Sequence, residues 1–467
     1  MDFRMPVWRF LVVFSWCLIP ACRSAADHSA ADKVSVFPDD RTASTLFHAG
    51  VETLTRSIME DILSPPVAGR VYAYASLAGW ETWCAAANAP DLATGLAPGL
   101  AERSLLPRLP DAEPLPPPPP GVNASVASMQ AFLSTAKALV FTEDFLDAFE
   151  REWLNGLPGQ DEIAASRAYG QLAAEHFIRY AQSDRYPQTR TMTKHPEPDG
   201  PGSWNPTPPL FMGGLEPHWN KLRPFTLDSA SQFAPPPPLP YSEAPNSPFM
   251  ALVQEVHETA TNLTPEQEAI ARFWDCNPYV TQEQAHLMSG TKKITPGGHW
   301  MAITGHAARQ SRADYPSTLR AYALTAIALH DAFISCWDEK YRSNLIRPET
   351  VINRSIDPNW KPLLETPPFP EYPSGHSVIS SSACQVLSQL FGSSFAFTDS
   401  TESPFGLEPR SFTSFEQAVQ EASLSRLYGG IHYRPAVEMG LVQGTQVGRH
   451  VWQTLTAEPE TPVAEVP

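Results

Sequence analysis

The sequence predicts an all-α protein, and three observations lead to this class. Apolar residues recur mostly with the spacing of amphipathic helices, whereas the strict alternation typical of half-buried strands is scarce. With 467 residues, of which 42% are apolar, the chain can bury a large core. Two proline-rich stretches, 106–121 and 234–248, indicate extended surface connections, and no repeat of fixed period is visible. We therefore expect one compact domain that is a large helical bundle.

The apolar periodicity assigns helices to both halves of the chain. In the N-terminal region, residues 26–245, the predicted helices span 44–62, 69–86, 124–154 and 161–183. In the C-terminal region, residues 246–458, they span 248–276, 297–310, 317–343, 374–392, 415–428 and 435–455. Ser317 and Thr318 are expected to begin one of these helices, and Ser414 is expected to cap another, because it lies two residues before Glu416.

Residues 1–25 have the pattern of an export signal. Arg4 and Arg9 precede an apolar run from Phe10 to Ala21, which is short for a membrane span, and small residues follow it. The letters "IPAC" also loosely resemble a lipoprotein box, which would make Cys22 the lipidated first residue of the mature chain. We expect a protein that is periplasmic, secreted or tethered to the outer membrane, with at most a lipid anchor in the membrane.

Charge and cysteine spacing narrow the possible partners. The net charge of −17 argues against non-specific binding to nucleic acid or to an anionic membrane, so binding of an anion would need a local cluster of cations. Beyond the leader, the cysteines are Cys84, Cys276, Cys336 and Cys384. None of them lies in a CxxC pair, so the sequence predicts no zinc site, and we assign no disulfides.

The stretch "FPEYPSGH", residues 369–376, leads directly into a predicted helix. Ser374 offers a hydroxyl there, and Gly375 begins a run of backbone N–H groups that have no acceptor within the helix. Such a helix N-terminus is a ready site for an anion, and His376 would be an acid or a base beside it. The cations for this anion have to come from elsewhere in the chain.

Candidate cations lie in two other segments. Lys340 and Arg347 are seven residues apart, which places them near one helix face, although Pro348 disfavours helix at Arg347. Arg426 lies near the end of a predicted helix, and His432 follows that end. Taken singly, each is more often a solvated or structural residue, so only their convergence on one place would indicate a site.

Three motifs occur together in this part of the chain: "KYRSNLIRP", "PSGH" and "SRLYGGIH". In these motifs the sequence resembles the vanadium-dependent haloperoxidases and the type 2 phosphatidic-acid phosphatase superfamily, which share K-x6-RP, PSGH and SR-x5-H. The resemblance spans residues 273–450 and implies the helical bundle of the vanadium haloperoxidases and acid phosphatases. Trp337 and Phe369 resemble pocket aromatics of chloroperoxidase-like and bacterial iodoperoxidase-like members, which favours the haloperoxidases.

The resemblance also implies a cofactor and roles. One vanadate per chain is expected, with hydrogen peroxide and a halide as substrates. Vanadate or phosphate would be held by Lys340, Arg347, Ser374, Gly375 and Arg426. His432 would be the axial metal ligand through Nε2, His376 would move protons on the opposite side, and Lys340 would polarise peroxide. The expected pocket residues are Trp337, Phe369, Asp338 and Tyr279, although a solvated acid remains the more common reading for Asp338.

One position departs from the phosphatases, which usually carry an aspartate four residues after the histidine. Here that residue is Ala436, so Glu438 or a backbone carbonyl is expected to hold Nδ1 of His432. The leading hypothesis is an exported haloperoxidase that oxidises iodide, then bromide. The alternatives are an exported acid phosphatase with His432 as nucleophile and a non-catalytic oxyanion-binding protein. The sequence does not indicate the organic acceptor, or whether the chain is a monomer or a dimer.

Overall fold

The computed structural model describes residues 40–87, 104–157, 160–193, 200–278, 281–284, 287–290 and 292–457. The expected export signal at 1–25, with Cys22, and the expected pocket residue Tyr279 lie outside these residues. None of the described helices combines the length and the apolarity that crossing a bilayer requires.

The described residues are mostly helical, which confirms the predicted all-α class. In the first half the helices are α1 (Asp40–Glu60), α2 (Pro65–Ala87), α3 (Ala124–Lys137), α4 (Asp144–Asn155), α5 (Gln160–Gln182) and α6 (Tyr186–Thr189). In the second half they are α7 (Pro248–Thr261), α8 (Pro265–Phe273), α9 (Pro296–Ser311), α10 (Tyr315–Ser343), α11 (Pro348–Ser355), α12 (Gly375–Phe391), α13 (Phe415–Tyr428) and α14 (Arg434–Thr456).

Short elements complete the described fold. The 3₁₀ turns are η3 (Leu106–Arg108), η4 (Trp219–Lys221) and η5 (Ser403–Phe405). Two small antiparallel pairs, which the sequence did not predict, are formed by β1 (Thr281–Gln284) with β2 (Leu287–Gly290), and by β3 (Phe397–Asp399) with β4 (Arg410–Phe412).

Two predicted helices are in fact pairs of helices. The prediction of one helix over 124–154 is wrong because the chain turns between α3 and α4, where the Asp61 carboxylate accepts hydrogen bonds from the amides of Phe141 and Thr142. The predicted helix 248–276 is divided by Thr264, which begins α8 with a capping box that Gln267 completes. The first break depends on a distant side chain, whereas the second is visible in the sequence.

A capping side chain or a proline marks the start of each helix discussed here. The side chain of Asp314 caps α10, so the expectation that Ser317 and Thr318 begin this helix was wrong by a few residues. Ser414 caps α13 as predicted, and Ser374 caps α12 by accepting from the amide of Ser377. Arg347 is extended, with φ −77° and ψ 150°, and Pro348 begins α11, a short helix that was not predicted.

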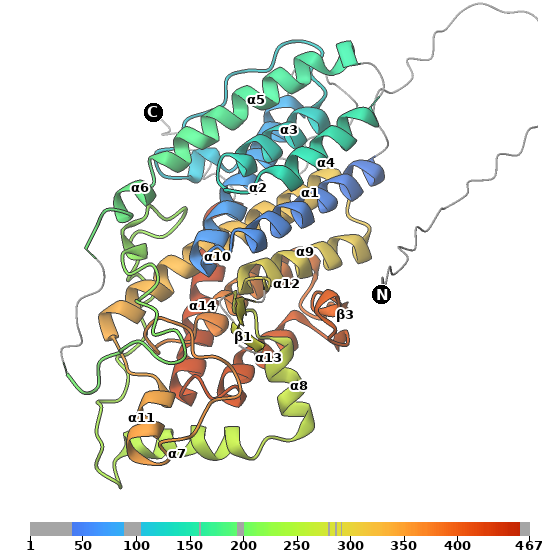
Figure 1. Ribbon diagram of the computed structural model, residues 1–467. Coiled ribbons are helices and arrows are strands. Elements are labelled where there is room, and N and C mark those ends of the chain that lie inside the picture. Colours follow the sequence, from blue (N-terminus) through green and yellow to red (C-terminus); the bar gives the residue numbers. More distant parts are fainter. Residues whose placement is uncertain are drawn as a thin grey trace, which may run out of the picture. The chain divides into compact units, whose positions relative to one another are not determined.

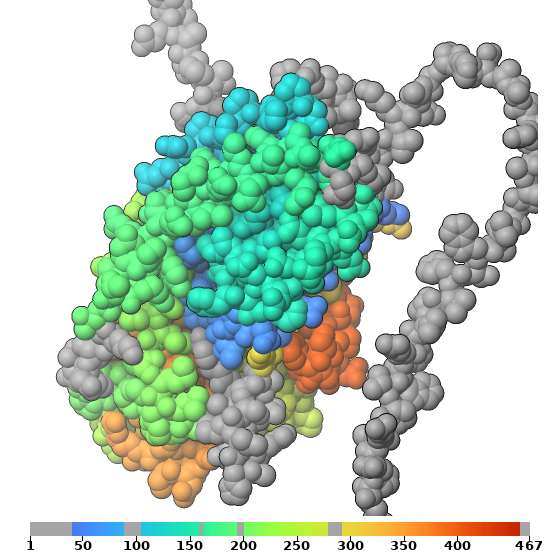
Figure 2. Space-filling model, turned by 45° about the horizontal axis from the view of Figure 1, so that its top comes forward, coloured from blue at the N-terminus to red at the C-terminus, as the bar shows by residue number. Residues whose placement is uncertain are grey.

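The 29-residue helix α10 is central to the arrangement of the described helices. It packs against α2 on the side of the N-terminal helices and against α12 and α14 from the C-terminal half, and Figure 1 shows it running between these groups. In Figure 2 the teal and green segments of the N-terminal half cover the upper face, and orange and red segments reach the surface below. The last two turns of α10 carry Trp337 and Lys340.

Helices α12 and α14 approach each other so closely that three positions on α14 have room only for glycine. A Cβ atom added to Gly444 would lie 2.0 Å from the carbonyl oxygen of Val378, and one added to Gly448 would lie 2.4 Å from that of Ser382. At the N-terminal end of the same row, a Cβ on Gly440 would lie 2.9 Å from the carbonyl oxygen of Ser374. This row of glycines therefore sets the distance between the starts of the two helices.

We expect Gly444→Ala to destabilise the fold, because its methyl group would collide with a backbone oxygen that cannot rotate away. The cost should be about 3 kcal/mol, the upper part of the range for overpacked cores. It can be measured by urea unfolding followed by circular dichroism. Gly213→Ala is the control, because a Cβ there would meet no atom of the described residues within 4 Å. Equal unfolding midpoints for the two variants would contradict the close approach of α12 and α14.

Candidate active site

The structure brings the residues of the three motifs together at the ends of two helices and the starts of three others. Lys340 lies near the end of α10, Arg347 precedes α11, and Arg426 lies in the last turn of α13. Gly375 begins α12, and His432 lies two residues before α14. All three cations are buried, with at most 1% of each residue exposed. The convergence on which the sequence hypothesis depended is present in the fold.

A cavity lies at this junction. Its polar lining includes Cys276, Asn277, His376, Arg426 and His432. Prolines and aromatic or aliphatic side chains, among them Trp337 and Phe369, form most of the rest. Lys340, Arg347 and Ser374 are not part of this lining, but each lies beside a residue that is.

His432 is oriented by a residue that the sequence did not suggest. Its Nδ1 lies 2.8 Å from Oε1 of Glu371, which also accepts from the amide of Tyr433 at 2.9 Å. The expectation that Glu438 or a backbone carbonyl holds this nitrogen was wrong, and Glu438 is exposed. Because a carboxylate accepts, Nδ1 carries the proton, and Nε2, which accepts from Nη1 of Arg347 at 3.1 Å, is the unprotonated nitrogen.

Burial and neighbouring cations keep His432 neutral. Burial is the main reason that its pKa lies well below 6.5, and the charges of Arg347 and Lys340 lower it further. Burial also raises the pKa of Glu371 to about 7, against the opposing effect of the same cations. A neutral imidazole with Nε2 unprotonated is the form that can ligate a metal or attack an electrophile.

Each of the two arginines has one hydrogen-bond donor without an acceptor among the described residues. Arg347 donates from Nε to the carbonyl of Phe369 and from Nη1 to that of Ile431, but its Nη2 has no partner among the described residues. Arg426 donates from Nη1 to the carbonyl of Trp274, while its Nε likewise has no partner in the described part of the chain. Buried donors without acceptors are costly, so this site fits an anion that would accept from both.

Neither arginine has a carboxylate in an ion pair, and the same holds for Lys340, within the described residues. Two buried acids offset part of this positive charge: Glu371 acts on Arg347 and Lys340, and Asp275 acts on Arg426. At the start of α12, the Ser374 hydroxyl accepts from Ser377 and so keeps its own proton for donation. Backbone N–H groups of the first turn add to this donor set, which suits a tetrahedral oxyanion such as vanadate or phosphate.

Lys340 departs from the expected geometry. Its ammonium donates to three backbone carbonyls, those of Pro370 at 3.0 Å, Glu371 at 3.1 Å and Pro373 at 2.6 Å. Its donors therefore hold the loop before α12 in place, and Lys340 acts on the cavity through its charge and through this loop. Burial is the main reason that its pKa falls to about 7.

His376 has the opposite tautomer to His432. Its Nε2 lies 3.0 Å from the carbonyl oxygen of Trp274, which can only accept, so Nε2 carries the proton and Nδ1 is the base. Burial, followed by the charge of Arg426, holds the pKa of His376 well below 6.5. The same Trp274 carbonyl accepts from Arg426 and so fixes a histidine and an arginine together.

The expected pocket aromatics support the cations directly. Phe369 lies between Lys340, with Nζ 5.0 Å from the ring centroid, and Arg347, with Cζ at 5.1 Å. Trp337 packs on Phe369 with a centroid distance of 5.0 Å. Asp338, in contrast, does not line the cavity, because its carboxylate accepts from Asn220 and pairs with Arg342.

Sequence reasoning missed two parts of this site. Glu371 lies inside "FPEYPSGH", and the only signal for it was an acid within an otherwise apolar, proline-rich loop. The carbonyl of Trp274 left no signal at all, because a backbone acceptor depends on the path of the chain and not on residue type.

Comparisons with known proteins identify relatives of this fold. The family model described as the second helical-bundle domain of VCPO matches residues 320–459. A bacterial vanadium-dependent iodoperoxidase crystal structure is 45% identical, with 88% of this chain and 96% of that chain covered and a TM-score of 0.80. The holo form of a bacterial vanadium-dependent chloroperoxidase shares the fold at 16% identity, with 85% and 93% covered and a TM-score of 0.61. No curated protein sequence matches the chain.

We expect Glu371→Ala to weaken oxyanion binding by about 10- to 100-fold, the usual effect of losing the partner that orients a ligating histidine. Vanadate affinity can be measured by isothermal titration calorimetry. Glu438→Ala is the matched control, because Glu438 was the other candidate partner and is exposed. A loss in the Glu438 variant, or none in the Glu371 variant, would contradict the assignment.

Proposed function

The chain belongs to the vanadium-dependent haloperoxidase family, and we propose that it uses vanadate and hydrogen peroxide to oxidise a halide, with iodide as the preferred one. The products are hypohalous acid or an equivalent oxidised halogen. We also propose that the protein is exported, on the pattern of residues 1–25, and that Cys22 carries a lipid if the lipoprotein signal is used.

One observation carries the proposal: three buried cations adjoin a cavity lined by two neutral imidazoles, and two of these cations have N–H donors without an acceptor among the described residues. A cavity of this charge requires an anion, and a tetrahedral oxyanion matches donors that arrive from several directions. The unprotonated Nε2 of His432 adds a metal ligand, which phosphate does not need but vanadate does.

Vanadate, when bound, supplies a Lewis acid that activates hydrogen peroxide toward attack by a halide. Arg347 and Arg426 would hold its oxygens with their unused donors, helped by the Ser374 hydroxyl and the first amides of α12. His432 would ligate it through Nε2 while Glu371 keeps the Nδ1 proton in place. His376 would take a proton from the incoming peroxide at Nδ1 and return it to the leaving water.

Iodide is proposed for two reasons. It is the most easily oxidised of the three halides, so it needs the least activation of peroxide, and the structure that is 45% identical to this chain is that of an iodoperoxidase. The apolar lining around Trp337 and Phe369 also suits a large, weakly hydrated anion better than a small one. Bromide is the next candidate, and chloride the most demanding.

The pair of Glu371 and His432 favours a second candidate function. A carboxylate that orients the imidazole and leaves Nε2 unprotonated also suits a nucleophile, so hydrolysis of phosphate esters through His432 is the alternative. In that case vanadate would inhibit the enzyme, because it would occupy the place of the substrate.

We expect the purified protein to form triiodide from iodide and peroxide only after vanadate is added, with one vanadate per chain at saturation. His376→Ala should lower kcat by roughly 10²- to 10⁴-fold, the usual contribution of a positioned acid or base, while vanadate still binds. His432→Ala should lose vanadate binding and activity together. The absorbance of triiodide measures the rate, and vanadium content measures binding.

The control for both variants is His257→Ala, since His257 packs near Trp360 away from the cavity. Hydrolysis of p-nitrophenyl phosphate that vanadate inhibits, without peroxidase activity, would establish the phosphatase instead. Vanadate binding without either activity would leave an oxyanion-binding protein and would contradict the proposal. Rates with iodide, bromide and chloride under the same conditions test the halide order.

Vanadate affinity should fall as the pH rises above about 7. In the free protein the pKa of Lys340 is about 7, and a bound anion raises it, so binding above this pH takes up a proton. The affinity should therefore weaken by up to roughly tenfold per pH unit from this group. Glu371 and vanadate also titrate, but both remain in Lys340→Met, so the difference between the two pH profiles isolates Lys340. Parallel profiles would contradict the charge assigned to it.

A further inference from the structure

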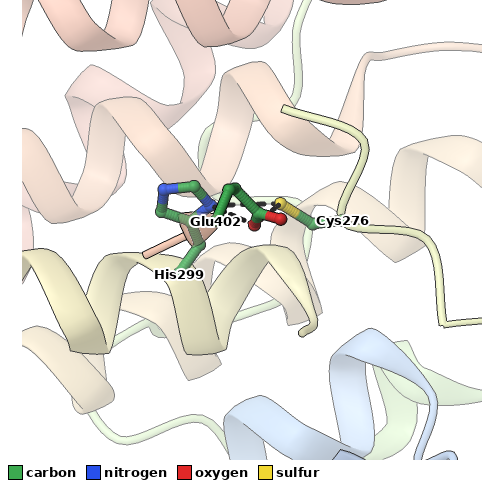
Figure 3. A group of neighbouring side chains, drawn as sticks. All are labelled: Cys276, His299 and Glu402. Carbon is green, nitrogen blue, oxygen red and sulfur yellow. Dashed lines mark hydrogen bonds and ion pairs between the residues drawn. The ribbon is translucent and has the colours of Figure 1, made fainter. Parts of the chain in front are cut away.

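A second cluster of polar side chains adjoins the cavity, which one of its members, Cys276, also lines, and the proposed function gives this cluster no role. It consists of Cys276, which follows α8, His299 in the first turn of α9, and Glu402, just before η5 (Figure 3). All three side chains are buried. The three segments that carry them are separate in sequence, so the fold has brought a thiol, an imidazole and a carboxylate to one point.

The three potential ligand atoms are spaced as they would be around one metal ion. Nδ1 of His299 lies 3.3 Å from Sγ of Cys276 and 3.2 Å from Oε1 of Glu402, and Sγ lies 3.9 Å from the same oxygen. Zinc bonds of about 2.0–2.3 Å in a tetrahedron place ligand atoms roughly 3.3–3.6 Å apart. The two distances from Nδ1, 3.3 and 3.2 Å, are at the edge of this range, and the 3.9 Å between Sγ and Oε1 is longer, so a bound ion would draw the thiol and the carboxylate together.

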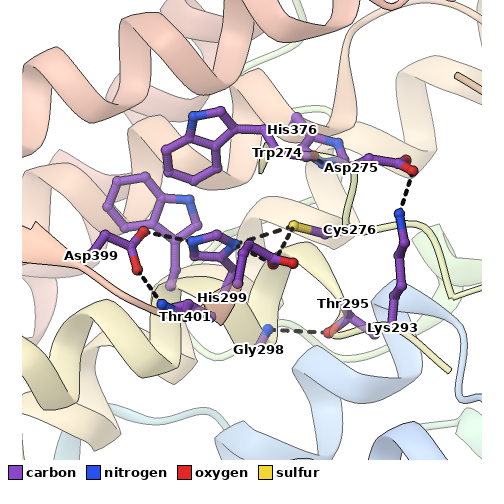
Figure 4. A network of polar contacts seen from close by, with 12 residues as sticks. Trp274, Asp275, Cys276, Lys293, Thr295, Gly298, His299, His376, Asp399 and Thr401 are labelled. Carbon is purple, nitrogen blue, oxygen red and sulfur yellow. Dashed lines mark hydrogen bonds and ion pairs between the residues drawn. The ribbon is translucent and has the colours of Figure 1, made fainter. Parts of the chain in front are cut away.

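The other nitrogen of the imidazole has the partner that metal-binding histidines usually have. Nε2 of His299 lies 2.6 Å from Oδ2 of Asp399, and Asp399 is itself held by the amide of Thr401 (Figure 4). A carboxylate there fixes the Nε2–H tautomer and leaves Nδ1 as the nitrogen that faces the thiol and Glu402. This hydrogen bond is independent of the three ligand distances and supports the same interpretation.

The charge of the cluster also favours a cation. Two carboxylates, Glu402 and Asp399, are buried here, and within the described residues their only ion-pair partners are histidines. A single imidazolium could balance one of the two charges. Arg426, whose charge acts on Cys276, donates to Trp274 and belongs to the adjoining site.

We propose that Cys276, His299 and Glu402 bind one divalent cation of the zinc class, with Asp399 positioning His299. The mixed sulfur, nitrogen and oxygen donors suit zinc better than calcium or magnesium, which prefer oxygen alone. Zinc is also inert to redox chemistry, which is an advantage beside a site that handles peroxide. The sequence analysis predicted no zinc site because it relied on CxxC spacing. The three ligands proposed here come from separate segments, so no local motif marks them.

The ion would act on the neighbouring site through a short segment. Cys276 lies two residues after Trp274, whose carbonyl accepts from both His376 and Arg426. The ring of Trp274 also stacks on His299 at 4.6 Å. A metal that ties Cys276 to His299 would hold this carbonyl, and with it the tautomer of His376, so its role is structural.

The test uses the full-length protein and no vanadium, so its result does not depend on the proposed function. Cells are grown with zinc or with cobalt, and the protein is passed through gel filtration before its metal content is measured. We expect about one zinc or cobalt per chain. Cobalt should show the visible bands of a tetrahedral ion together with a sulfur-to-cobalt charge-transfer band in the near ultraviolet.

Cys276→Ser should lose the charge-transfer band, and Glu402→Gln should lower metal content by at least tenfold after dialysis against a weak chelator. Cys384→Ser is the matched control, because Cys384 is also a buried thiol with a glutamate beside it but has no histidine partner among the described residues. Circular dichroism establishes whether each variant is folded.

Wild-type protein that carries no stoichiometric metal would overturn the proposal and leave a hydrogen-bonded imidazolium between Asp399 and Glu402. A cobalt spectrum that Cys276→Ser does not change would also overturn it, since the metal would then lie elsewhere. If Cys276→Ser does not fold, the Glu402→Gln result decides, because an amide of the same size leaves the packing intact.

Discussion

Three cationic side chains, Lys340, Arg347 and Arg426, are buried together where several helices begin or end. The rest of the site can be understood from the free-energy cost of burying these charges. A buried charge is strongly unfavourable unless it is paired or fully hydrogen-bonded, and like charges add their repulsion. The chain offsets this cost in part with backbone carbonyls and with the ring of Phe369 between Lys340 and Arg347. The donors left over on the two arginines are the part of the cost that an oxyanion would remove.

Close packing of two helices fixes the geometry around these charges. His432 lies just before α14, and Ser374 caps α12, so the distance between the two helices sets the distance between the two histidine-bearing segments. The glycines at 440, 444 and 448 allow that distance to be short. The amide of Ser374 also donates to the carbonyl of Ala436, which links the two helix starts directly. Ala436 thus contributes through its backbone, although its side chain cannot orient His432.

Much of the fold and the core of the site could be predicted because they depend on local patterns. Helical periodicity located most helices, and three motifs with fixed internal spacing located Lys340, Arg347, His376, Arg426 and His432. The parts that could not be predicted depend on contacts between distant segments. Glu371 meets His432 across 61 residues of sequence, and Asp61, just beyond α1, holds the turn that follows α3. The hydrogen bonds of Lys340 to three carbonyls could not be predicted either, because they depend on how the loop before α12 folds back.

The two histidines of the cavity are distinguished by what holds them, and this difference assigns their chemistry. A carboxylate holds Nδ1 of His432, so the ring gains basicity at Nε2 and is stabilised if it carries positive charge or donates electrons to a metal. A neutral carbonyl holds Nε2 of His376, which fixes a tautomer without adding charge, and Arg426 at the same carbonyl opposes protonation. His432 is therefore suited to a lasting bond with an electrophilic centre. His376 is suited to accepting a proton and releasing it again, because no carboxylate of the described residues pairs with it to retain the charge.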